Sequence, residues 1–174
     1  LEVLTGAILN AFERAEPPEV HQPVPPPLPD VVTHDELAVA ADPDTLCIGL
    51  VDHPELQRQE TLQLDPQRLG GVLVVGAPSS GVSTTLGAIA EAAHRQGGWQ
   101  VHAITTNGGP GELGGLIANY SVRGIVDASD HEPLRRLLEE LSAAIAGTDS
   151  TPETRRLVIL DGFGEFEQLQ EPVN

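Results

Sequence analysis

The fold of this chain is decided by a stretch rich in Gly and Ser, Gly76-Ala77-Pro78-Ser79-Ser80-Gly81-Val82-Ser83-Thr84. It follows the apolar run at residues 72–75 and opens a helical pattern, and this order of strand, turn and helix is the one that a phosphate-binding loop requires. The stretch matches G-x-x-x-x-G-K-[ST], except that Val82 stands in place of the lysine. It therefore predicts a phosphate-binding loop that has lost its principal cation.

The backbone of such a loop makes most of the contacts, because successive N–H groups and the N-terminus of the following helix hold the phosphates. Ser83 keeps the hydroxyl that would bind Mg²⁺. With Val82 in place of lysine, a hydrogen bond to a charged group of roughly 1.5–3 kcal/mol is lost, which weakens ATP binding roughly ten- to a hundred-fold. We expect weak nucleotide binding by Gly76, Ser79, Ser80, Gly81, Val82, Ser83 and Thr84.

The second half of the expected site is the end of another strand. Residues 157–160 form a continuous apolar run, of the kind that is buried on both faces of a parallel sheet, and Asp161 follows them. An acid in this position holds Mg²⁺ in nucleotide-hydrolysing proteins, so Asp161 and Ser83 are the expected metal ligands. Gly162 stands where motor ATPases usually carry a second carboxylate, and we assign no catalytic base. The alternative is an ordinary Gly-rich turn beside an unrelated strand.

Periodicity and turn signals predict strands that alternate with helices. The expected helices carry apolar stripes and cover residues 3–14, the segment from the loop to Gly97, and residues 134–145. The expected strands are residues 47–51 and 61–64, which we expect to pair, and residues 72–75, 99–104 and 157–160. Two capping boxes are expected, at Thr33 with Glu36 and at Ser129 with Glu132. The alternation indicates an α/β domain with a mostly parallel sheet flanked by helices.

Prolines divide the chain into three parts. The run Val24-Pro25-Pro26-Pro27-Leu28-Pro29 cannot continue a helix and favours a stiff, extended connector. We therefore expect the end of a preceding domain at residues 1–16, an inter-domain linker at 17–45 and the nucleotide-binding domain at 46–174. Few residues follow Asp161, fewer than a doubly wound sheet needs, so we expect that domain to be incomplete at its C-terminal end.

Composition restricts the partners. Nine basic residues stand against twenty-six acidic ones, a net charge of -17, which disfavours nucleic acid because its affinity depends on cations that displace counterions. Cys47 is the single cysteine, so an internal disulfide is excluded and a reducing compartment fits. The six histidines show no metal-ligand spacing. No apolar run reaches the roughly 18–20 residues that span a bilayer.

Several segments, taken in order, resemble an FtsK/SpoIIIE-type ATPase domain. They are similar in particular to the tandem ATPase domains of EccC, the motor of type VII secretion systems. The Pro-rich stretch resembles the linker between those domains, and Leu157–Gly162 resembles their Walker B strand. The other matching segments are residues 49–64, 76–84, 104–117 and 123–145.

The resemblance implies a RecA-like P-loop NTPase fold and a cytoplasmic domain of a membrane-anchored parent, with hexameric assembly as a further expectation. It also implies three kinds of partner: neighbouring ATPase domains of the same chain, the membrane complex of the secretion system, and small helical secreted substrates. The departures at Val82 and Gly162 argue against hydrolysis. They favour a degenerate module that regulates the motor, supports it structurally or docks its substrates.

Two other functions stay open. An active DNA translocase of the FtsK type would need cations that face the strand, and the net charge of -17 opposes it. A protein-binding module without any nucleotide predicts that Mg-ATP leaves the melting temperature unchanged.

Overall fold

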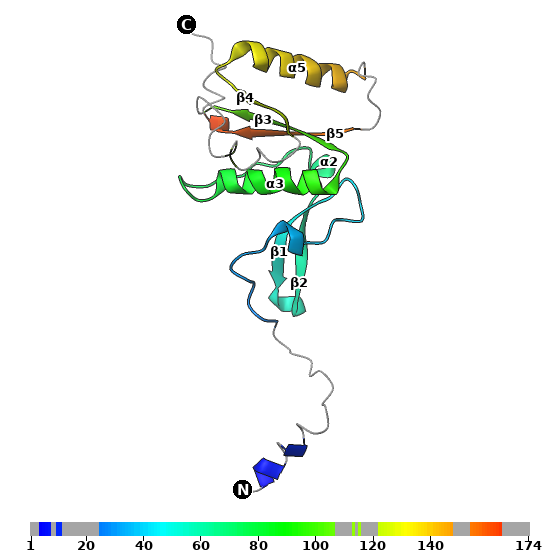
Figure 1. Cartoon of the computed structure of the whole chain (residues 1–174), viewed down its shortest axis with the longest axis vertical. Coiled ribbons are helices and arrows are strands. Elements are labelled where there is room, and N and C mark those ends of the chain that lie inside the picture. The colour runs from blue at the N-terminus through cyan, green and yellow to red at the C-terminus, as the bar shows by residue number, and fades with distance from the viewer. Residues whose placement is uncertain are drawn as a thin grey trace.

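The computed structural model describes residues 4–7, 10–11, 25–106, 113, 115, 122–147 and 154–164, and the structural statements below concern this part of the chain. Its strands are β1 Leu46–His53, β2 Arg58–Leu64, β3 Trp99–Thr105, β4 Val122–Asp127 and β5 Arg155–Asp161 (Figure 1). Its helices are α2 Pro66–Leu69, α3 Val82–Gln96 and α5 His131–Ile145, with short 3-10 turns at η1 His34–Glu36 and η2 Pro54–Leu56.

A three-stranded parallel sheet with the strand order β4-β3-β5 forms the centre of the structure. β3 pairs along its whole length with β5, from Trp99 opposite Arg155 to Thr105 opposite Asp161, and its other edge pairs with β4. α3 covers one face of this sheet and α5 the other (Figure 1). The predicted α/β class, with a parallel sheet flanked by helices, is therefore confirmed.

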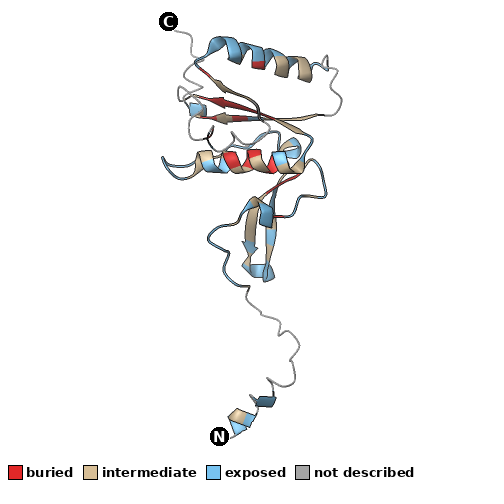
Figure 2. Cartoon of the chain, in the orientation of Figure 1, coloured by how far each residue is buried: buried red, intermediate tan, exposed pale blue. Residues whose placement is uncertain are grey.

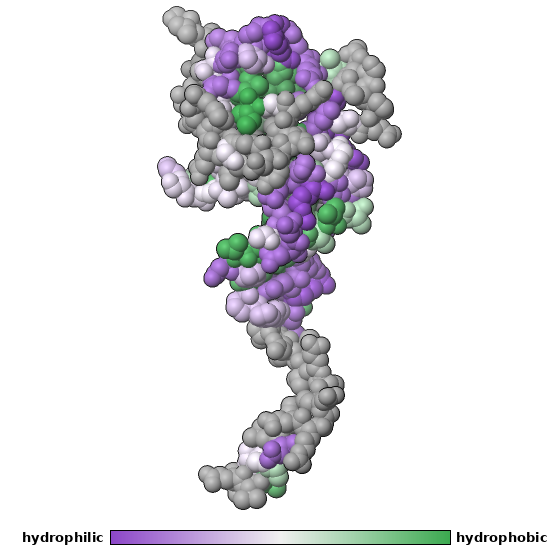
Figure 3. Space-filling model, in the orientation of Figure 1, coloured by the Kyte–Doolittle hydropathy of each residue, from purple (hydrophilic) through white to green (hydrophobic). Residues whose placement is uncertain are grey.

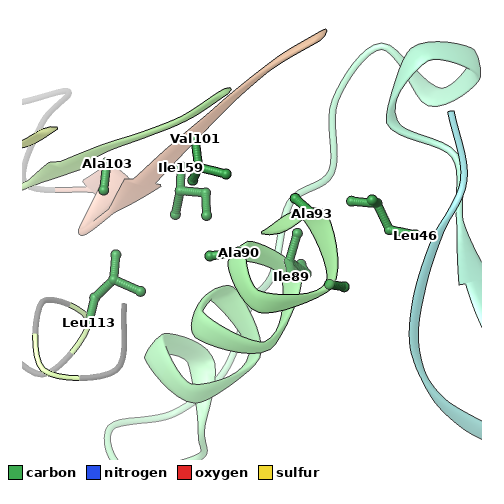
Figure 4. Close-up of a cluster of buried hydrophobic side chains, with 9 residues drawn as sticks. Leu46, Ile89, Ala90, Ala93, Val101, Ala103, Leu113 and Ile159 are labelled. Atoms are coloured by element: carbon green, nitrogen blue, oxygen red, sulfur yellow. The ribbon is translucent and has the colours of Figure 1, made fainter. Parts of the chain in front are cut away.

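Small aliphatic side chains build the core between α3 and the sheet. Ala90 and Ala93 of α3 are fully buried and share a cluster with Val101, Ala103 and Ile159 of the sheet (Figure 4). Because alanine side chains are short, they allow a helix to lie close to a sheet, which suits a chain with only 3% aromatic residues. A second cluster, on the α5 side, contains Ile104, Ala128 and Leu137.

The outer face of α5 is strongly hydrophilic (Figure 3). Arg135 forms ion pairs with Glu132 and Glu139, one turn away on either side, and Arg136 pairs with Glu132 at 2.9 Å. Exposed pairs of this kind contribute little to stability but keep the helix surface solvated. No helix among the described residues combines the length and apolarity that crossing a bilayer requires.

The first two strands form a separate antiparallel hairpin, with a register that runs from Leu46 opposite Leu64 to His53 opposite Arg58. This confirms the predicted pairing of residues 47–51 with 61–64. The hairpin lies on the side of α3 that faces away from the parallel sheet (Figure 1). Leu46 is fully buried in the α3 cluster and anchors the base of the hairpin there. Cys47 is buried beside it, and burial raises the pKa of its thiol, as expected for a core residue.

The predicted strand at residues 72–75 is wrong, because these residues belong to no strand or helix. Leu73 is 71% exposed and Val75 is 82% exposed, whereas the helix that follows carries several buried residues (Figure 2). An apolar run becomes a strand only when a neighbouring strand takes its hydrogen bonds. Within the described residues the parallel sheet ends at β5, and residues 72–75 do not pair with it.

The two capping boxes have opposite outcomes. At η1, the Glu36 carboxylate accepts hydrogen bonds from the Thr33 backbone N–H at 2.7 Å and from its hydroxyl at 2.8 Å, as predicted. At α5 the prediction is wrong, because the N-cap is Asp130. Ser129 instead donates its backbone N–H and its hydroxyl to the carboxylate of Asp127, which ends the preceding strand and lies two residues away.

The described part of the expected linker is docked on the domain. Arg95, near the end of α3, donates to the carbonyl oxygens of His34 and Leu37, and Leu37 is buried. Gln96 donates to the carbonyls of Ala40 and Asp42 at 3.0 and 3.1 Å. These contacts fasten residues 34–42 to the same helix that begins at the Gly-rich loop.

Two other predictions fall largely outside the described residues. Of the expected helix at residues 3–14, positions 4–7 and 10–11 are described and are helical. Of residues 107–117, the later part of one segment named in the resemblance, only positions 113 and 115 are described, and both are helical. The expected domain limits at residues 16 and 45 stay predictions.

Candidate functional site

The candidate site lies where the Gly-rich loop meets the carboxyl end of β5. The hydroxyl of Ser83, in the first turn of α3, donates a hydrogen bond of 3.1 Å to Oδ2 of Asp161, the last residue of β5. The two residues are far apart in sequence, and the parallel sheet brings them together because α3 begins at the edge where β5 ends. The structure thus joins the two halves of the site that the sequence predicted.

The loop itself is a compact turn that depends on two glycines. A Cβ atom on Gly76 would lie 2.0 Å from the Ser80 hydroxyl oxygen and 2.9 Å from a methyl group of Val82, so only glycine fits there without a shift. Gly81 has a φ of +91°, in the left-handed region that favours glycine. The Ser80 N–H donates to the Ala77 carbonyl at 3.0 Å and closes the turn. Ser79 adopts a φ of +62° within it.

The N-terminus of α3 carries a partial positive charge at this point. Gly81 is the N-cap and supplies no side-chain cap, and the first turn contains no acidic residue. The carbonyl of Gly81 accepts from the Thr85 N–H at 2.8 Å and from the Thr85 hydroxyl at 3.0 Å. The N-terminus of a helix carries roughly half an elementary positive charge and exposes backbone N–H donors, a combination that suits phosphate. Thr84 lies in this turn and is exposed.

Val82 brings no charge to the loop. One of its methyl groups lies near Gly76, so the side chain leans back towards the start of the turn. A lysine at this position would bring an ammonium group to the bound phosphates, and valine cannot. The loop therefore carries a branched apolar side chain at the position where the predicted pattern has a lysine.

The backbone conformation after Asp161 favours glycine. Gly162 has a φ of +87°, and its carbonyl accepts a hydrogen bond of 3.4 Å from the Thr106 hydroxyl. A glutamate in this conformation would be strained, because only glycine adopts such a φ at little cost. The structure thus gives a local reason for the absence of a second carboxylate beside Asp161. The later acids Glu165 and Glu167 lie outside the described residues.

A large cavity opens beside the loop, with a volume of about 1450 Å³. Its walls include the loop, the irregular segment at residues 70–75, and β5 with Phe163. Sites for small ligands usually have about 300–1,000 Å³, so this cavity is larger than a nucleotide alone requires. The nucleotide-binding residues that we predicted occupy only the end of it nearest α3.

The described groups at the site are suited to binding. The groups brought together are backbone N–H donors, one hydroxyl and the carboxylate of Asp161, which is largely buried. Hydroxyl and carboxylate oxygens are suitable ligands for Mg²⁺, which is otherwise held by phosphate oxygens and water. No group of three or more His, Cys, Asp or Glu within the described ranges could hold a metal ion.

Sequence reasoning missed the part that Phe163 plays in the cavity. Phe163 is 51% exposed although the chain has only three phenylalanines, and it lines the wall near Asp161. The rarity of aromatic residues was the available signal, because an exposed phenylalanine two residues after a strand end stands out in such a chain. Trp99, the first residue of β3, is half-buried and packs against the α3 cluster.

The described residues thus define a mixed α/β structure with a Gly-rich helix N-terminus at the carboxyl edge of a parallel sheet. Comparisons with protein-family models, curated proteins and solved structures find no match for this chain. The resemblance to FtsK/SpoIIIE-type and EccC domains therefore stays a prediction that rests on the sequence segments given above.

Proposed function

We propose that this chain is a degenerate RecA-like P-loop module that binds a nucleoside triphosphate weakly and does not hydrolyse it at motor rates. The observation that carries the proposal is the hydrogen bond between Ser83 and Asp161 at the N-terminus of α3. In a working P-loop these two oxygens would share one Mg²⁺ ion. Here they lie within direct reach of each other, beside a loop in which a side chain at position 76 would require Ser80 and Val82 to shift.

Each group of atoms in the proposed site would have its own role in binding. Backbone N–H groups from Ser79 to Thr84 would hold the phosphates of ATP, and Ser83 with Asp161 would hold Mg²⁺, which neutralises phosphate charge when bound. The residues that favour turnover are missing, because Val82 cannot neutralise the transferred phosphate and Gly162 cannot polarise water. We therefore infer a binding function in which nucleotide stabilises the module rather than fuels it.

The biological setting that we propose is a tandem ATPase chain of the EccC kind, with this module in a regulatory, structural or substrate-docking role. Its partners would be the neighbouring ATPase domains, the membrane complex of a type VII secretion system and small helical secreted substrates. The parent protein would be membrane-anchored and hexameric, with this domain on the cytoplasmic side. The DNA translocase alternative is less well supported, since the net charge is -17.

The lysine substitution Val82→Lys tests the proposal directly. We expect Mg-ATP to bind roughly ten- to a hundred-fold more tightly to this variant than to the original chain, because the new ammonium group meets the phosphates. Isothermal titration calorimetry measures the change. Val82→Met is the matched control, since it adds a long side chain without charge and should leave the affinity unchanged.

Two results would overturn the proposal. One is Mg-ATP affinity that is too weak to measure in both the original chain and Val82→Lys, which would favour a protein-binding module. The other is phosphate release by the original chain at the rates of ordinary motors, about 1 s⁻¹ or faster, which would restore an active ATPase.

A further inference from the structure

Residues 33–45, which we call the strap, lie on the domain with little burial. Of these residues only Leu37 and Thr45 are buried, and Val39 is 52% exposed. Leu37 belongs to neither of the two core clusters, whereas Leu46, which follows the strap and begins β1, is fully buried in the α3 cluster. The strap therefore joins the hydrophobic core only at its C-terminal end.

Side chains of the domain hold the strap by its main chain. Arg95 and Gln96, at the end of α3, and the indole of Trp99, at the start of β3, donate hydrogen bonds to it. The acceptors are the carbonyl oxygens of His34, Leu37, Ala40, Asp42 and Pro43. After release, water can bind the donors and the carbonyls, so each of these bonds contributes only modestly to docking.

Opposite charges meet near both ends of the strap. Asp35 lies 3.9 Å from the Arg95 guanidinium, and Asp44 forms an ion pair with Arg155, the first residue of β5. The Asp35 side chain is 98% exposed, so its pair is solvated and contributes little. The side chains of Asp44 and Arg155 are 36% and 24% exposed, so this pair also reaches solvent and is weakened by salt.

The docking residues lie at the ends of their elements that are opposite the candidate site. Gln96 ends α3, whereas Ser83 lies in its first turn, and Arg155 begins β5, whereas Asp161 ends it. The contacts of the strap are therefore separate from those proposed for nucleotide. Docking of the strap does not depend on the proposed function.

We propose that the strap releases from the domain as one unit, with Leu46 as its pivot, while the parallel sheet and its helices stay folded. Segments with few buried apolar contacts are the ones that open locally in this way. Release adds the thirteen residues 33–45 to the Pro-rich connector before them, which at about 3.3 Å per residue gives up to about 43 Å of additional reach. The docked and released strap thus set two ranges of distance between the domain and the residues that precede the connector.

Hydrogen exchange in the native state distinguishes release of the strap from unfolding of the domain. The indole N–H of Trp99 reports docking, because it donates to the Pro43 carbonyl at 3.1 Å, and the amides of β3, the central strand, report the folded sheet. Ile159→Ala removes a core side chain that is buried whether the strap is docked or released. It should speed exchange of the β3 amides at least about tenfold and leave indole exchange within about twofold. Urea below the unfolding transition should have the same selectivity, since release exposes little surface.

Gln96→Glu tests the docking contacts themselves. The new carboxylate has the shape of the amide but donates no hydrogen bond, and it faces the carbonyls of Ala40 and Asp42. Indole exchange should become at least about tenfold faster, since two hydrogen bonds are lost. Gln63→Glu, at an exposed position of β2, adds the same charge as a matched control and should leave indole exchange unchanged. In the original chain, NaCl at about 0.5 M should speed indole exchange about twofold to fivefold, because the ion pairs of the strap are screened.

Distances between two spin labels test the added reach. Val31→Cys, before the strap, and Ile145→Cys, at the end of α5, place the labels at positions that are 74% and 89% exposed, and Cys47→Ala removes the native thiol. When Arg95→Leu and Gln96→Glu are added together, double electron–electron resonance should show a broad population at longer distances than the docked one. Addition of Gln63→Glu alone should keep the docked distribution.

Three results would overturn the inference. One is equal acceleration of indole and β3 exchange by Ile159→Ala, which would mean that the strap leaves only when the domain unfolds. Another is equal acceleration of indole exchange by Gln96→Glu and Gln63→Glu. The third is indole protection that is lost on dilution, which would assign the docked strap to a second copy of the chain.

Discussion

Two apolar runs in this protein have nearly the same sequence character and opposite surroundings. Residues 157–160 form the middle of β5, pair with β3 and bury Ile159 in the α3 cluster. Residues 72–75 consist of the same kinds of side chain, yet they form no strand and are largely exposed. The difference is the presence of a neighbour, because β3 supplies hydrogen bonds to the first run and nothing in the described chain supplies them to the second.

An apolar run in a sequence therefore indicates a tendency to form a strand. It does not show that a neighbouring strand pairs with it. Burial of a strand requires a partner edge and a covering layer, and both come from residues distant in sequence. β5 pairs with β3 and packs against α3, whereas residues 72–75 line the cavity. The predictions below test how far this contrast extends, beginning with the largest expected effect.

Truncation of one side chain in each apolar run compares how far the two runs are buried. We expect Ile159→Ala to lower the free energy of unfolding by about 2–5 kcal/mol, because it leaves a cavity in the α3 cluster. Val75→Ala removes an exposed side chain and should change it by no more than about 0.5 kcal/mol. Urea unfolding, with the m-value held as a check on the denatured state, gives both values. Similar losses for the two variants would mean that residues 72–75 are buried in solution, and the contrast would disappear.

A pair of glycine substitutions tests whether the unpaired run is ordered where it enters the loop. Gly76→Ala should cost about 1–3 kcal/mol of unfolding free energy, because the new Cβ meets the Ser80 hydroxyl and a Val82 methyl group. Gly71→Ala lies at the other end of the run with no atom within 4 Å of the new Cβ, and it should be close to neutral. Thermal unfolding compares the two.

The same glycine experiment has an internal control. Adding Ser80→Ala to Gly76→Ala should recover part of the loss, since it removes the atom that lies nearest to the new Cβ. A loss at Gly71 as large as that at Gly76 would show that the whole run is tightly packed. It would also contradict the open wall that the structure shows.

The smallest effect concerns the two predicted capping boxes, which also have similar sequence patterns and opposite outcomes. The box at η1 forms and the one at α5 does not. Hydrogen bonds from the Thr33 backbone N–H, and secondarily from its hydroxyl, lower the pKa of Glu36 below its ordinary value of 4.5. A lowered folded-state pKa means that the stabilisation is present above the ordinary value and is lost as the pH falls through the folded value. Carbon-detected NMR titration of Glu36 should show the lowered pKa directly.

Substitutions at Thr33 assign the cause of this shift. Thr33→Val removes the hydroxyl but keeps the backbone donor, so the pKa of Glu36 should rise part of the way back. Thr33→Ser keeps both donors and should leave it low. If Thr33→Val and Thr33→Ser titrate alike, the hydroxyl has no part in the capping box.

Much of the fold could be predicted because it depends on local patterns. The stripe of apolar residues and the stop at Gly97 define α3, and the alternation of strands and helices defines the parallel sheet. Features that depend on competition between alternative hydrogen-bond partners were not predicted. Ser129 binds Asp127 instead of capping α5, and Arg95 and Gln96 dock the expected linker through backbone carbonyls, which leave no pattern in the sequence.

The candidate site divides in the same way. The meeting of Ser83 with Asp161 follows from the order of strand, loop and helix, because the loop and the strand end must both lie at the carboxyl edge of the sheet. The cavity wall formed by Val158 and Phe163 does not follow from any motif, since it exists only because one edge of β5 is unpaired. Nucleotide, partners and biological setting stay predictions and need the experiments described above.

Trp99 gives this protein a built-in optical reporter. It is the single tryptophan, and its indole N–H donates a hydrogen bond of 3.1 Å to the carbonyl of Pro43, in the segment docked beside α3. Release of that segment would expose the indole to water and shift its fluorescence emission to longer wavelength. Attachment and detachment of residues 33–45 can therefore be followed in solution without any added label.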